Sequence, residues 1–388
     1  MRKRLGTERI ERVVVRGVNW VGDAVMTVPA LRELRRVLPG AHVTLATRAW
    51  AEGLFAGGDF IDDVLVLEQS GGKTAAALRE ARALGAGRFD LALIFPNAFA
   101  PALSAALARV PARLGYETQG RGPLLTKRVS VPEWRGKRHE VFYYLNLVAE
   151  LEKLLDGTST VETREPRLEL EVAEARTQEA LRLLREHGAL KPERGTQSHG
   201  LEAQARGPLV ALCPGSTNSR AKRWPAERFA AVADMLMTKA GACVILIGAG
   251  EEREVSEEVA RLMSQRPVVL TGKTSLAETA AVLKASDLLV TNDTGPAHVA
   301  AAVGCPVVVV FGPTNPLTTR PYSALAEVVR RPPDCAPCML RDCPIDHRCM
   351  TAVSAEEVFE RAQSALEARR ASRAEMFGDE LKGAEVSG

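Results

Sequence analysis

The sequence predicts an α/β protein with two domains, each built around a parallel sheet. Short apolar runs alternate with amphipathic segments, this alternation occurs twice, and a polar stretch at residues 156–166 separates the two series. A chain of 388 residues, 46% of them hydrophobic, is also long enough to form two cores. We therefore expect two Rossmann-like domains.

Each predicted element comes from a local pattern. In the first half, apolar runs predict strands at residues 13–15, 42–46, 64–67 and 91–95, separated by helical stretches such as 24–37. In the second half, strands are predicted at 208–213, 243–247, 268–270, 288–290 and 307–311, and helices near 225–239, 251–263 and 276–284. A capping box at Ser354 predicts a helix to about Arg369, followed by a frayed tail that contains Gly378, Gly383 and Gly388.

The domain boundaries are placed in polar segments. We assign residues 1–165 to an N-terminal domain, 166–352 to a C-terminal domain, and 353–388 to a C-terminal helix and flexible tail. The polar stretch 191–207 is interpreted as a flexible insertion before the first strand of the second half.

Charge and hydropathy exclude several classes of protein. The net charge of +3, from 51 basic and 48 acidic residues, argues against a general nucleic-acid binder. No apolar run reaches the roughly 18 residues that a transmembrane helix needs. The first residues lack the apolar region of a signal peptide, so we expect a cytoplasmic location.

The segment TNDTGPAH (291–298) follows an apolar run and predicts a turn between a strand and a helix. Pro296 is typical of an early helical position, which puts Asp293 or Thr294 near the N-cap. The first N–H groups of such a helix have no partner within it, so the turn can bind an anion. His298 is either a core histidine or a ligand to that anion, and we favour the second interpretation.

A second candidate anion site opens the second half. Residues 214–217 (PGST) offer backbone amides and hydroxyls after a predicted strand, and Lys222 and Arg223 precede Pro225 at a helix start. Cations are unfavourable beside a helix N-terminus unless an anion is present, and a diphosphate would suit. The alternative is that these are solvated basic residues.

The sequence offers no carboxylate pair for a metal–diphosphate complex, because Asp-x-Asp does not occur. We therefore expect no catalytic metal and no cofactor. Lys222, a protonated His298 and the amides around Thr294 and Gly295 would neutralise the diphosphate instead.

The turn after the first predicted strand contains Gly17 and Gly22, and a helix is expected to begin at about Asp23. Its spacing fits neither G-x-G-x-x-G nor the P-loop pattern. Asp23 either caps the helix or is a carboxylate that points into a cleft from the carboxyl end of the strand.

The segment 111–139 is basic. It contains Arg113, Arg121, Lys127, Arg128, Arg135, Lys137 and Arg138 against two glutamates. A solvated loop and an anion-binding surface are both compatible with this composition.

Seven cysteines in a chain expected in the cytoplasm do not indicate a disulfide framework. Cys213, Cys243 and Cys305 lie in or beside apolar strands and are interpreted as core residues. Cys335, Cys338, Cys343 and Cys349 could form a zinc site, remain buried reduced thiols, or pair by oxidation.

Taken in order, three motifs resemble the ADP-heptose:lipopolysaccharide heptosyltransferases. The motifs are Gly22-Asp23 before a helix with Pro29, Pro214-Gly215 with the run from Lys222 to Pro225, and the run from Asn292 to His298. The resemblance covers roughly residues 12–370, and the cysteine-rich segment is most similar to the heptosyltransferase II branch.

The resemblance implies a GT-B fold, and an inverting, metal-independent transfer of heptose from ADP-heptose to the lipid A inner core at the cytoplasmic membrane surface. The N-terminal domain would bind the acceptor, with Asp23 as the base. Asp293 would orient Lys222 or a sugar hydroxyl. The expected donor-binding residues are Ser216, Thr217, Lys222, Glu252 (or Glu251), Asp293, Thr294, Gly295 and His298, and the expected acceptor-binding residues are Asn19, Trp20, Arg121, Lys127 and Arg128.

Three other functions remain open on the sequence. A related transferase could add a different core heptose or glycosylate a protein. An epimerase of the same architecture would convert the donor without an acceptor. A non-catalytic protein would only bind the nucleotide sugar. The enzyme would be cytoplasmic, either free or peripheral at the inner membrane.

Overall fold

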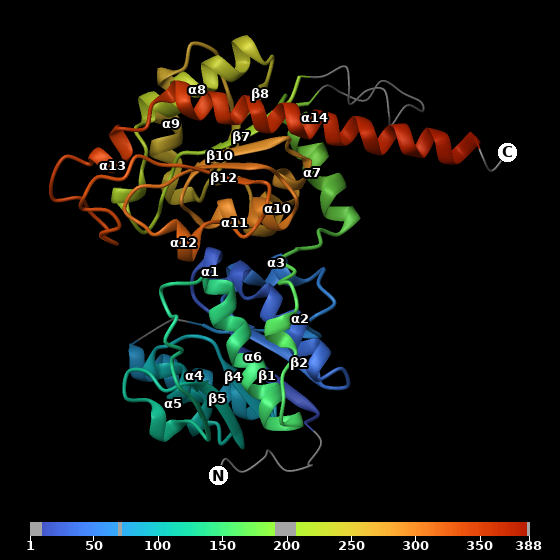
Figure 1. Ribbon diagram of the computed structural model, residues 1–388, viewed down its shortest axis with the longest axis vertical. Helices are drawn as coiled ribbons and strands as arrows, with labels where there is room; N and C mark the ends of the chain where they lie inside the picture. The colour runs from blue at the N-terminus through green and yellow to red at the C-terminus, as the bar shows by residue number, and fades with distance from the viewer. Residues whose placement is uncertain (1–9, 69–71, 191–206, 386–388) are drawn as a thin grey trace. The chain divides into compact units, whose positions relative to one another are not determined.

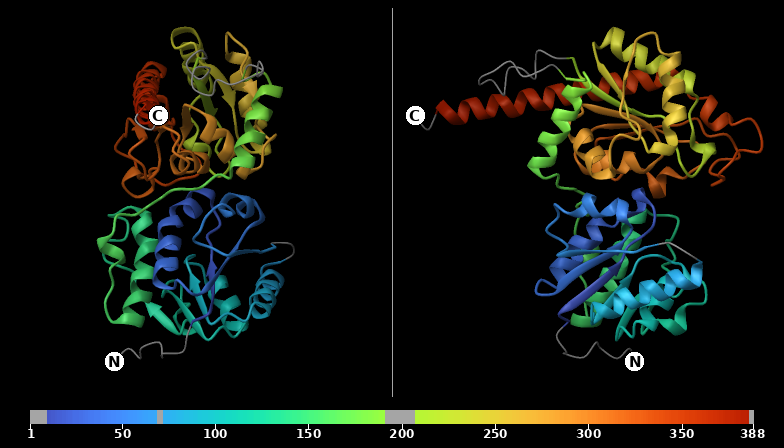
Figure 2. Two further views of the ribbon diagram at one scale, coloured as in Figure 1. Left: turned by 90° about the vertical axis from the view of Figure 1, so that its right-hand side faces the viewer. Right: turned by 180° about the vertical axis from the view of Figure 1, so that it is seen from behind.

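The computed structural model describes residues 10–68, 72–190 and 207–385, and it divides into two compact units, Met1–Glu171 and Val172–Gly388. Each unit is a six-stranded parallel sheet with helices on both faces (Figures 1 and 2). The expected α/β class with two Rossmann-like sheets is thereby confirmed. The predicted insertion lies, except for Gly207, outside the described residues.

Unit 1 has the sheet order β3-β2-β1-β4-β5-β6. Helices α2 and α6 pack together on one face of this sheet, and α4 and α5 pack together on the other (Figure 2). Its elements are β1 (Arg12–Arg16), α1 (Val21–Met26), α2 (Val28–Val37), β2 (His42–Thr47), η1 (Ala49–Ala51), α3 (Glu52–Phe55), β3 (Asp63–Val66), α4 (Lys73–Ala86), β4 (Leu91–Ile94), α5 (Phe99–Leu107), β5 (Ala112–Tyr116), η2 (Gly122–Leu124), β6 (Lys127–Val129), α6 (Glu140–Asp156) and η3 (Val161–Thr163).

Unit 2 repeats this topology with the order β12-β11-β10-β7-β8-β9. Helices α8 and α14 pack together, and α7 packs with α10. Its elements are α7 (Glu174–Glu186), β7 (Leu209–Cys213), η4 (Arg220–Lys222), α8 (Ala226–Lys239), β8 (Cys243–Leu246), η5 (Gly250–Glu252), α9 (Arg253–Leu262), β9 (Val268–Val269), α10 (Leu276–Ala285), β10 (Leu288–Asn292), α11 (Gly295–Ala302), β11 (Val307–Val310), α12 (Pro316–Thr319), β12 (Ala326–Val329), α13 (Arg348–Thr351) and α14 (Ala355–Glu385).

In each unit the strand order reverses between the first and fourth strands, β1 and β4 or β7 and β10. We call each of these two strand pairs a seam, and both seams are stabilised by the same kind of hydrogen bond. The N–H of Arg12 donates to Asp90 Oδ2 at 2.8 Å, and the N–H of Leu209 donates to Asp287 Oδ2 at 2.8 Å. In α/β sheets, ligands bind beyond the carboxyl ends of the strands at such a switch point.

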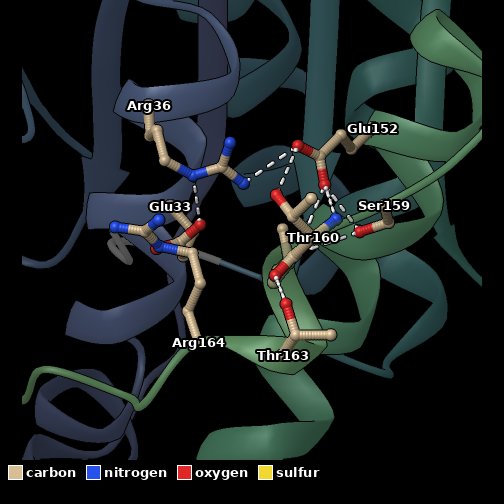
Figure 3. A network of polar contacts seen from close by, with 8 residues as sticks. Glu33, Arg36, Glu152, Ser159, Thr160, Thr163 and Arg164 are labelled. Atoms are coloured by element: carbon tan, nitrogen blue, oxygen red, sulfur yellow. Dashed lines mark hydrogen bonds and ion pairs between the residues drawn. The ribbon is translucent and has the colours of Figure 1, made fainter.

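A polar network joins α2, α6 and η3 in unit 1 (Figure 3). The Glu152 carboxylate is 2.9 Å from Arg36 Nη2 and accepts hydrogen bonds from Ser159 Oγ at 2.6 Å and Thr160 N at 2.7 Å. Burial opposes ionisation, but these bonds outweigh it and lower the pKa of Glu152 to about 2. The network therefore fixes the chain that follows α6.

Several predicted elements are corrected. The helix predicted at 24–37 is two helices, α1 and α2, that meet at Thr27. Pro29 lies in the first turn of α2, and it has no N–H with which to continue α1.

The C-terminal helix does not end near Arg369 but continues to Glu385, so the predicted frayed tail is wrong for residues up to 385. Gly388 lies outside the described residues.

Strands β5, β6 and β12 were not predicted. In β5 the sequence ARLGY interrupts the apolar pattern, yet Leu114 and Tyr116 are fully buried.

No described helix is both long and apolar enough to cross a membrane.

Candidate functional site

The switch point of unit 2 lies where β7 and β10 end. Asn292, the last residue of β10, is fully buried and joins the two following loops. Its Nδ2 donates to the carbonyls of Pro214 at 2.8 Å and Gly215 at 3.2 Å, and its Oδ1 accepts from the N–H of Trp224 at 3.0 Å. One side chain therefore fixes both predicted anion-binding segments with respect to the sheet.

Lys222 and Asp293 meet at this edge. Lys222 Nζ lies 2.9 Å from Asp293 Oδ2 and 3.2 Å from the Asp293 carbonyl. Thr314 Oγ1 donates to the same carboxylate oxygen at 2.6 Å. Asp293 is only 4% exposed, whereas Lys222 is 27% exposed. The ammonium is thus accessible, and a buried carboxylate holds it.

The segment that carries Lys222 is anchored by Trp224. This side chain is 2% exposed and meets the ring of Phe229 edge-on at 5.0 Å. Its Nε1 donates to the Val353 carbonyl at 3.1 Å. Burying an aromatic side chain of this size contributes about 2–3 kcal/mol, which holds η4 against the core.

Glu252 lies in a space that two glycines leave open. A Cβ at Gly215 would lie 2.3 Å from Glu252 Cδ, and one at Gly248 would lie 2.9 Å from Glu252 Oε2. The carboxylate accepts from Thr217 Oγ1 at 3.1 Å and from Ala249 N at 2.9 Å. Of the two glutamates left open, Glu252 is buried beside Thr217 and Glu251 is exposed.

The remaining predicted donor-binding residues lie close by in the chain. Ser216 is buried, and its carbonyl accepts from Arg223 Nη2 at 3.2 Å. Thr294 is the N-cap of α11, and its hydroxyl is 3.3 Å from that of Thr291. Gly295 begins α11, and His298 lies on the same helix with 4% exposure.

The switch point of unit 1 carries Asp23 in the first turn of α1, which begins at Val21 after the turn that follows β1. Trp20 takes the N-cap position, so the interpretation of Asp23 as the helix cap is wrong. Asp23 is half-buried, and its charge acts on Tyr144, a residue of α6. Burial and the nearby Asp23 carboxylate hold the pKa of Tyr144 well above its ordinary value. The Tyr144 hydroxyl therefore stays protonated beside this carboxylate.

Asn19 and Trp20 lie in the same turn and are exposed, Trp20 at 50%. Asn19 Oδ1 accepts from Arg48 Nε at 3.2 Å. These two residues and Asp23 therefore occupy one edge of the unit 1 sheet.

The predicted basic acceptor-binding residues are not brought together. Arg121 is fully buried, and its guanidinium donates to the carbonyls of Tyr116 at 2.7 Å and Ala98 at 3.1 Å, and to that of Pro96. Burial lowers its pKa to about 10. Lys127 and Arg128 are consecutive residues of β6, so their side chains point to opposite faces of the sheet.

The cysteines divide into two groups. Cys213 and Cys305 are buried, as expected for core residues, and Cys243 is half-buried. In the C-terminal group Cys349 is buried, but Cys335 and Cys343 are exposed, so the interpretation as buried thiols is wrong for these two. All seven are free thiols, and the described residues contain no group of three or more side chains placed to hold a metal ion.

The fold and the site define a class of protein. Two Rossmann-type units with polar loops at both switch points are the architecture of GT-B glycosyltransferases. The profile of glycosyltransferase family 9 (heptosyltransferase) matches residues 77–348, and the chain belongs to this family.

Similar proteins are known in several bacteria. The chain is 28% identical to lipopolysaccharide heptosyltransferase 2 of Escherichia coli K12 over 330 residues, which is 82% of this chain and 88% of that protein. It is 28% identical to lipooligosaccharide heptosyltransferase 2 of Haemophilus influenzae over 329 residues, with the same coverage.

Two solved structures have a similar fold. One is a family 9 glycosyltransferase from Veillonella parvula, with a TM-score of 0.76 and 26% identity over 92% of this chain and 97% of that one. The other is ADP-heptose lipopolysaccharide heptosyltransferase II of E. coli, with a TM-score of 0.73 and 24% identity over 93% of this chain and 100% of that one.

Proposed function

We propose that this protein transfers heptose from ADP-heptose to a heptose of the lipopolysaccharide inner core, with inversion and without a metal ion. Unit 2 binds the donor and unit 1 the acceptor. The similarity to lipopolysaccharide heptosyltransferases 2 supports this substrate pair. The strongest support for the proposal is the position of the Lys222 ammonium, which Asp293 holds beside the N-terminus of α11.

The donor diphosphate needs positive charge and N–H groups. Lys222 offers the first, and the start of α11 at Thr294 and Gly295 offers the second. Negative charge on the leaving ADP grows in the transition state, so Lys222 stabilises that state more than the bound donor. A protonated His298 on α11 adds to the charge that meets the diphosphate, and Thr217 and Glu252 line the rest of the donor site.

The transfer is a single displacement. The acceptor hydroxyl oxygen forms a bond to the anomeric carbon, while the bond from that carbon to the diphosphate oxygen breaks and ADP keeps its electron pair. Asp23 removes the hydroxyl proton. Because the acceptor attacks from the side opposite to ADP, the configuration at this carbon inverts.

The acceptor surface of unit 1 consists of Asn19 and Trp20, next to Asp23. Lys127 and Arg128 point to opposite faces of the sheet, so at most one of them faces the acceptor. Arg121 is not part of this surface, because its guanidinium is buried and its Nε and Nη1 donate to backbone carbonyls. The enzyme works in the cytoplasm, peripheral at the inner membrane, where a phosphorylated or Kdo-bearing inner core would be the acceptor.

One assay tests the proposal. The purified protein is incubated with ADP-heptose and with lipid A cores that carry no, one or two heptoses, and the products are followed by mass spectrometry. We expect one added heptose on the one-heptose core alone, in EDTA as well as in buffer. A strict requirement for added magnesium would contradict the metal-free mechanism.

The same assay separates the other functions. Addition to a different core, or to a protein, would identify a related transferase. A change of donor without an acceptor would identify an epimerase, and binding without turnover would identify a non-catalytic sensor.

A further inference from the structure

The cysteine-rich loop, residues 334–349, has no role in the proposed reaction. The chain enters it after β12 and leaves it in α13. The N–H of Met339 donates to the Pro313 carbonyl at 2.9 Å. At its other end Met350 packs so closely on Gly312 that a Cβ there would lie 2.3 Å from Met350 Sδ. The loop therefore has a defined position on unit 2.

This loop holds both polar backbone groups of Ala221, the residue before Lys222. The N–H of Ala221 donates to the Arg341 carbonyl at 2.9 Å, and the Ala221 carbonyl lies 2.5 Å from His347 Nε2. Ser219 Oγ donates to the same Arg341 carbonyl at 3.2 Å. Ala221 is 2% exposed, so water does not compete for these bonds.

His347 has two features that point to a specific role. A carbonyl oxygen can only accept, so Nε2 must carry the hydrogen of this bond. The residue also has a φ of 58°, in the left-handed region that side chains other than glycine adopt infrequently. Hydrogen bonds hold this conformation, because the His347 N–H donates to Cys343 Sγ at 3.3 Å and its carbonyl accepts from Met350 N at 2.9 Å. An uncommon conformation maintained in this way is often functional.

The bond from His347 acts on Lys222 through one rigid unit. The Ala221 carbonyl and the Lys222 nitrogen belong to the same planar peptide group, so fixing the oxygen fixes where the Lys222 side chain begins. At its other end, Lys222 Nζ is held by Asp293 at 2.9 Å. The lysine is thus held at both ends by parts of unit 2 that are distant in sequence.

We infer that His347 is a positioning residue for Lys222, and that the cysteine-rich loop holds His347 in place. We call the hydrogen bond from His347 to the Ala221 carbonyl, together with this loop, the brace. This inference rests on the proposed function, because it assigns the brace to the lysine that neutralises the diphosphate. This role of the loop does not depend on metal binding. The other anchors of the loop do not involve the imidazole, so replacement of His347 should leave unit 2 folded.

The test compares His347→Ala with His347→Gln, whose amide can still donate to the Ala221 carbonyl, and with Ile345→Ala as a control. Ile345 belongs to the same loop and is 62% exposed. Hydrogen exchange of the peptide covering residues 219–224 reports on the brace without any substrate. We expect faster exchange than in wild type for His347→Ala, and exchange near that of wild type for His347→Gln and Ile345→Ala.

Turnover reports on the function of the brace. We expect His347→Ala to lower kcat about tenfold with a donor KM within about twofold, since small displacements of a catalytic group have large effects on rate. In a Lys222→Ala background the same change should have no further effect, because the residue that it positions is absent.

Several outcomes would overturn the inference. Unchanged exchange in His347→Ala would show that there is no brace, and a full additional loss of rate in the Lys222→Ala background would show that His347 acts elsewhere. If exchange responds as expected but the wild-type protein transfers no heptose, the proposed function fails and the structural brace remains.

Discussion

The carboxyl edges of the two sheets hold their polar side chains in different ways. In unit 2 the side chains of Lys222, Asp293 and Asn292 are fixed by hydrogen bonds and ion pairs to several segments. In unit 1, Asp23 lies beside the buried ring of Tyr144, and its neighbours Asn19 and Trp20 are exposed. The same topology therefore supports one edge with buried polar side chains and one edge with solvent-exposed residues, which we call the open edge.

This difference fits the two proposed substrates. A diphosphate has the same charge and size in every turnover, so donors fixed in advance cost no reorganisation as it departs. A lipid-linked oligosaccharide is large, and an open edge can admit it. Four substitutions test this comparison, three at the edges themselves and one in the structure that supports unit 1.

The largest effects on turnover are expected at the two proposed catalytic residues, the first of which is tested by Asp23→Asn. Asparagine keeps the size of the side chain but cannot accept the acceptor proton. We expect turnover to fall by about a hundredfold or more, the range for a lost general base, with ADP affinity and thermal stability near wild type. Asp156→Asn, at the far end of α6 in the same unit, is the control. A near-normal rate in Asp23→Asn would show that Asp23 is not the base.

Lys222→Ala should lower turnover by about two to three orders of magnitude, because it removes charge stabilisation of the departing ADP. Unlike Asp23→Asn, it should also weaken ADP binding, which isothermal calorimetry can measure. Lys222→Arg keeps the charge and should recover part of the rate, while Lys239→Ala controls for loss of a surface cation. Activity within a few-fold of wild type would assign Lys222 to the surface and remove the contrast between the two edges.

Asn292→Asp tests whether the unit 2 edge is fixed by this one side chain. The substitution removes the donor to the Pro214 and Gly215 carbonyls and places a carboxylate against their oxygens. We expect the free energy of unfolding to fall by about 2–4 kcal/mol, since a buried group loses its partners, and turnover to fall about tenfold through displacement of the loops. Denaturant unfolding and steady-state kinetics give the two values. Unchanged stability would mean that the loops are held by other contacts.

Glu152→Gln should affect stability but not turnover, because Glu152 supports unit 1 away from its switch point (Figure 3). The pKa of Glu152 is lowered to about 2 in the folded state, so its contribution is fully present above its unfolded pKa and is lost as pH falls through the folded value. We expect wild type to be more stable by about 1–3 kcal/mol at pH 7 and the difference to shrink between about pH 4.5 and pH 2.

Chemical denaturation at several pH values measures this difference. Glu150→Gln is a matched control on the same helix, because Glu150 pairs with Lys153 at the surface, where such pairs contribute less than about 1 kcal/mol. An equal response to pH in both variants would contradict the role of the network.

The sequence predicted the central strands well because they are buried on both faces and therefore uniformly apolar. It did not predict β5, in which Arg113 extends its guanidinium to the carbonyls of Val110 and Leu124, so that a charged residue fits a buried strand. It did not predict the break at Thr27 either. Pro29 could have indicated that break, because a proline in the first turn of a helix is a common start signal.

At the candidate site, the sequence predicted Lys222 and Asp293 as functional residues because their types and positions have direct chemical consequences. Asn292 and His347 were not predicted as site residues. Their roles depend on backbone groups far away in the chain, the carbonyls of Pro214 and Ala221, which only the folded structure brings within reach. Local patterns carry no information on such contacts.

The seam between the first and fourth strands also has a consequence for how the chain folds. In each seam an aspartate carboxylate, of Asp90 or Asp287, accepts a hydrogen bond from a backbone N–H that is 78 residues earlier in the chain. Each seam therefore requires the closure of a long loop. Contacts this distant in sequence form slowly, whereas β1 with β2 and β7 with β8 are neighbours along the chain. During synthesis each half-sheet can assemble early. The candidate site of unit 2, where Lys222 meets Asp293, forms only when the half-sheet that contains β10 docks on the one that contains β7.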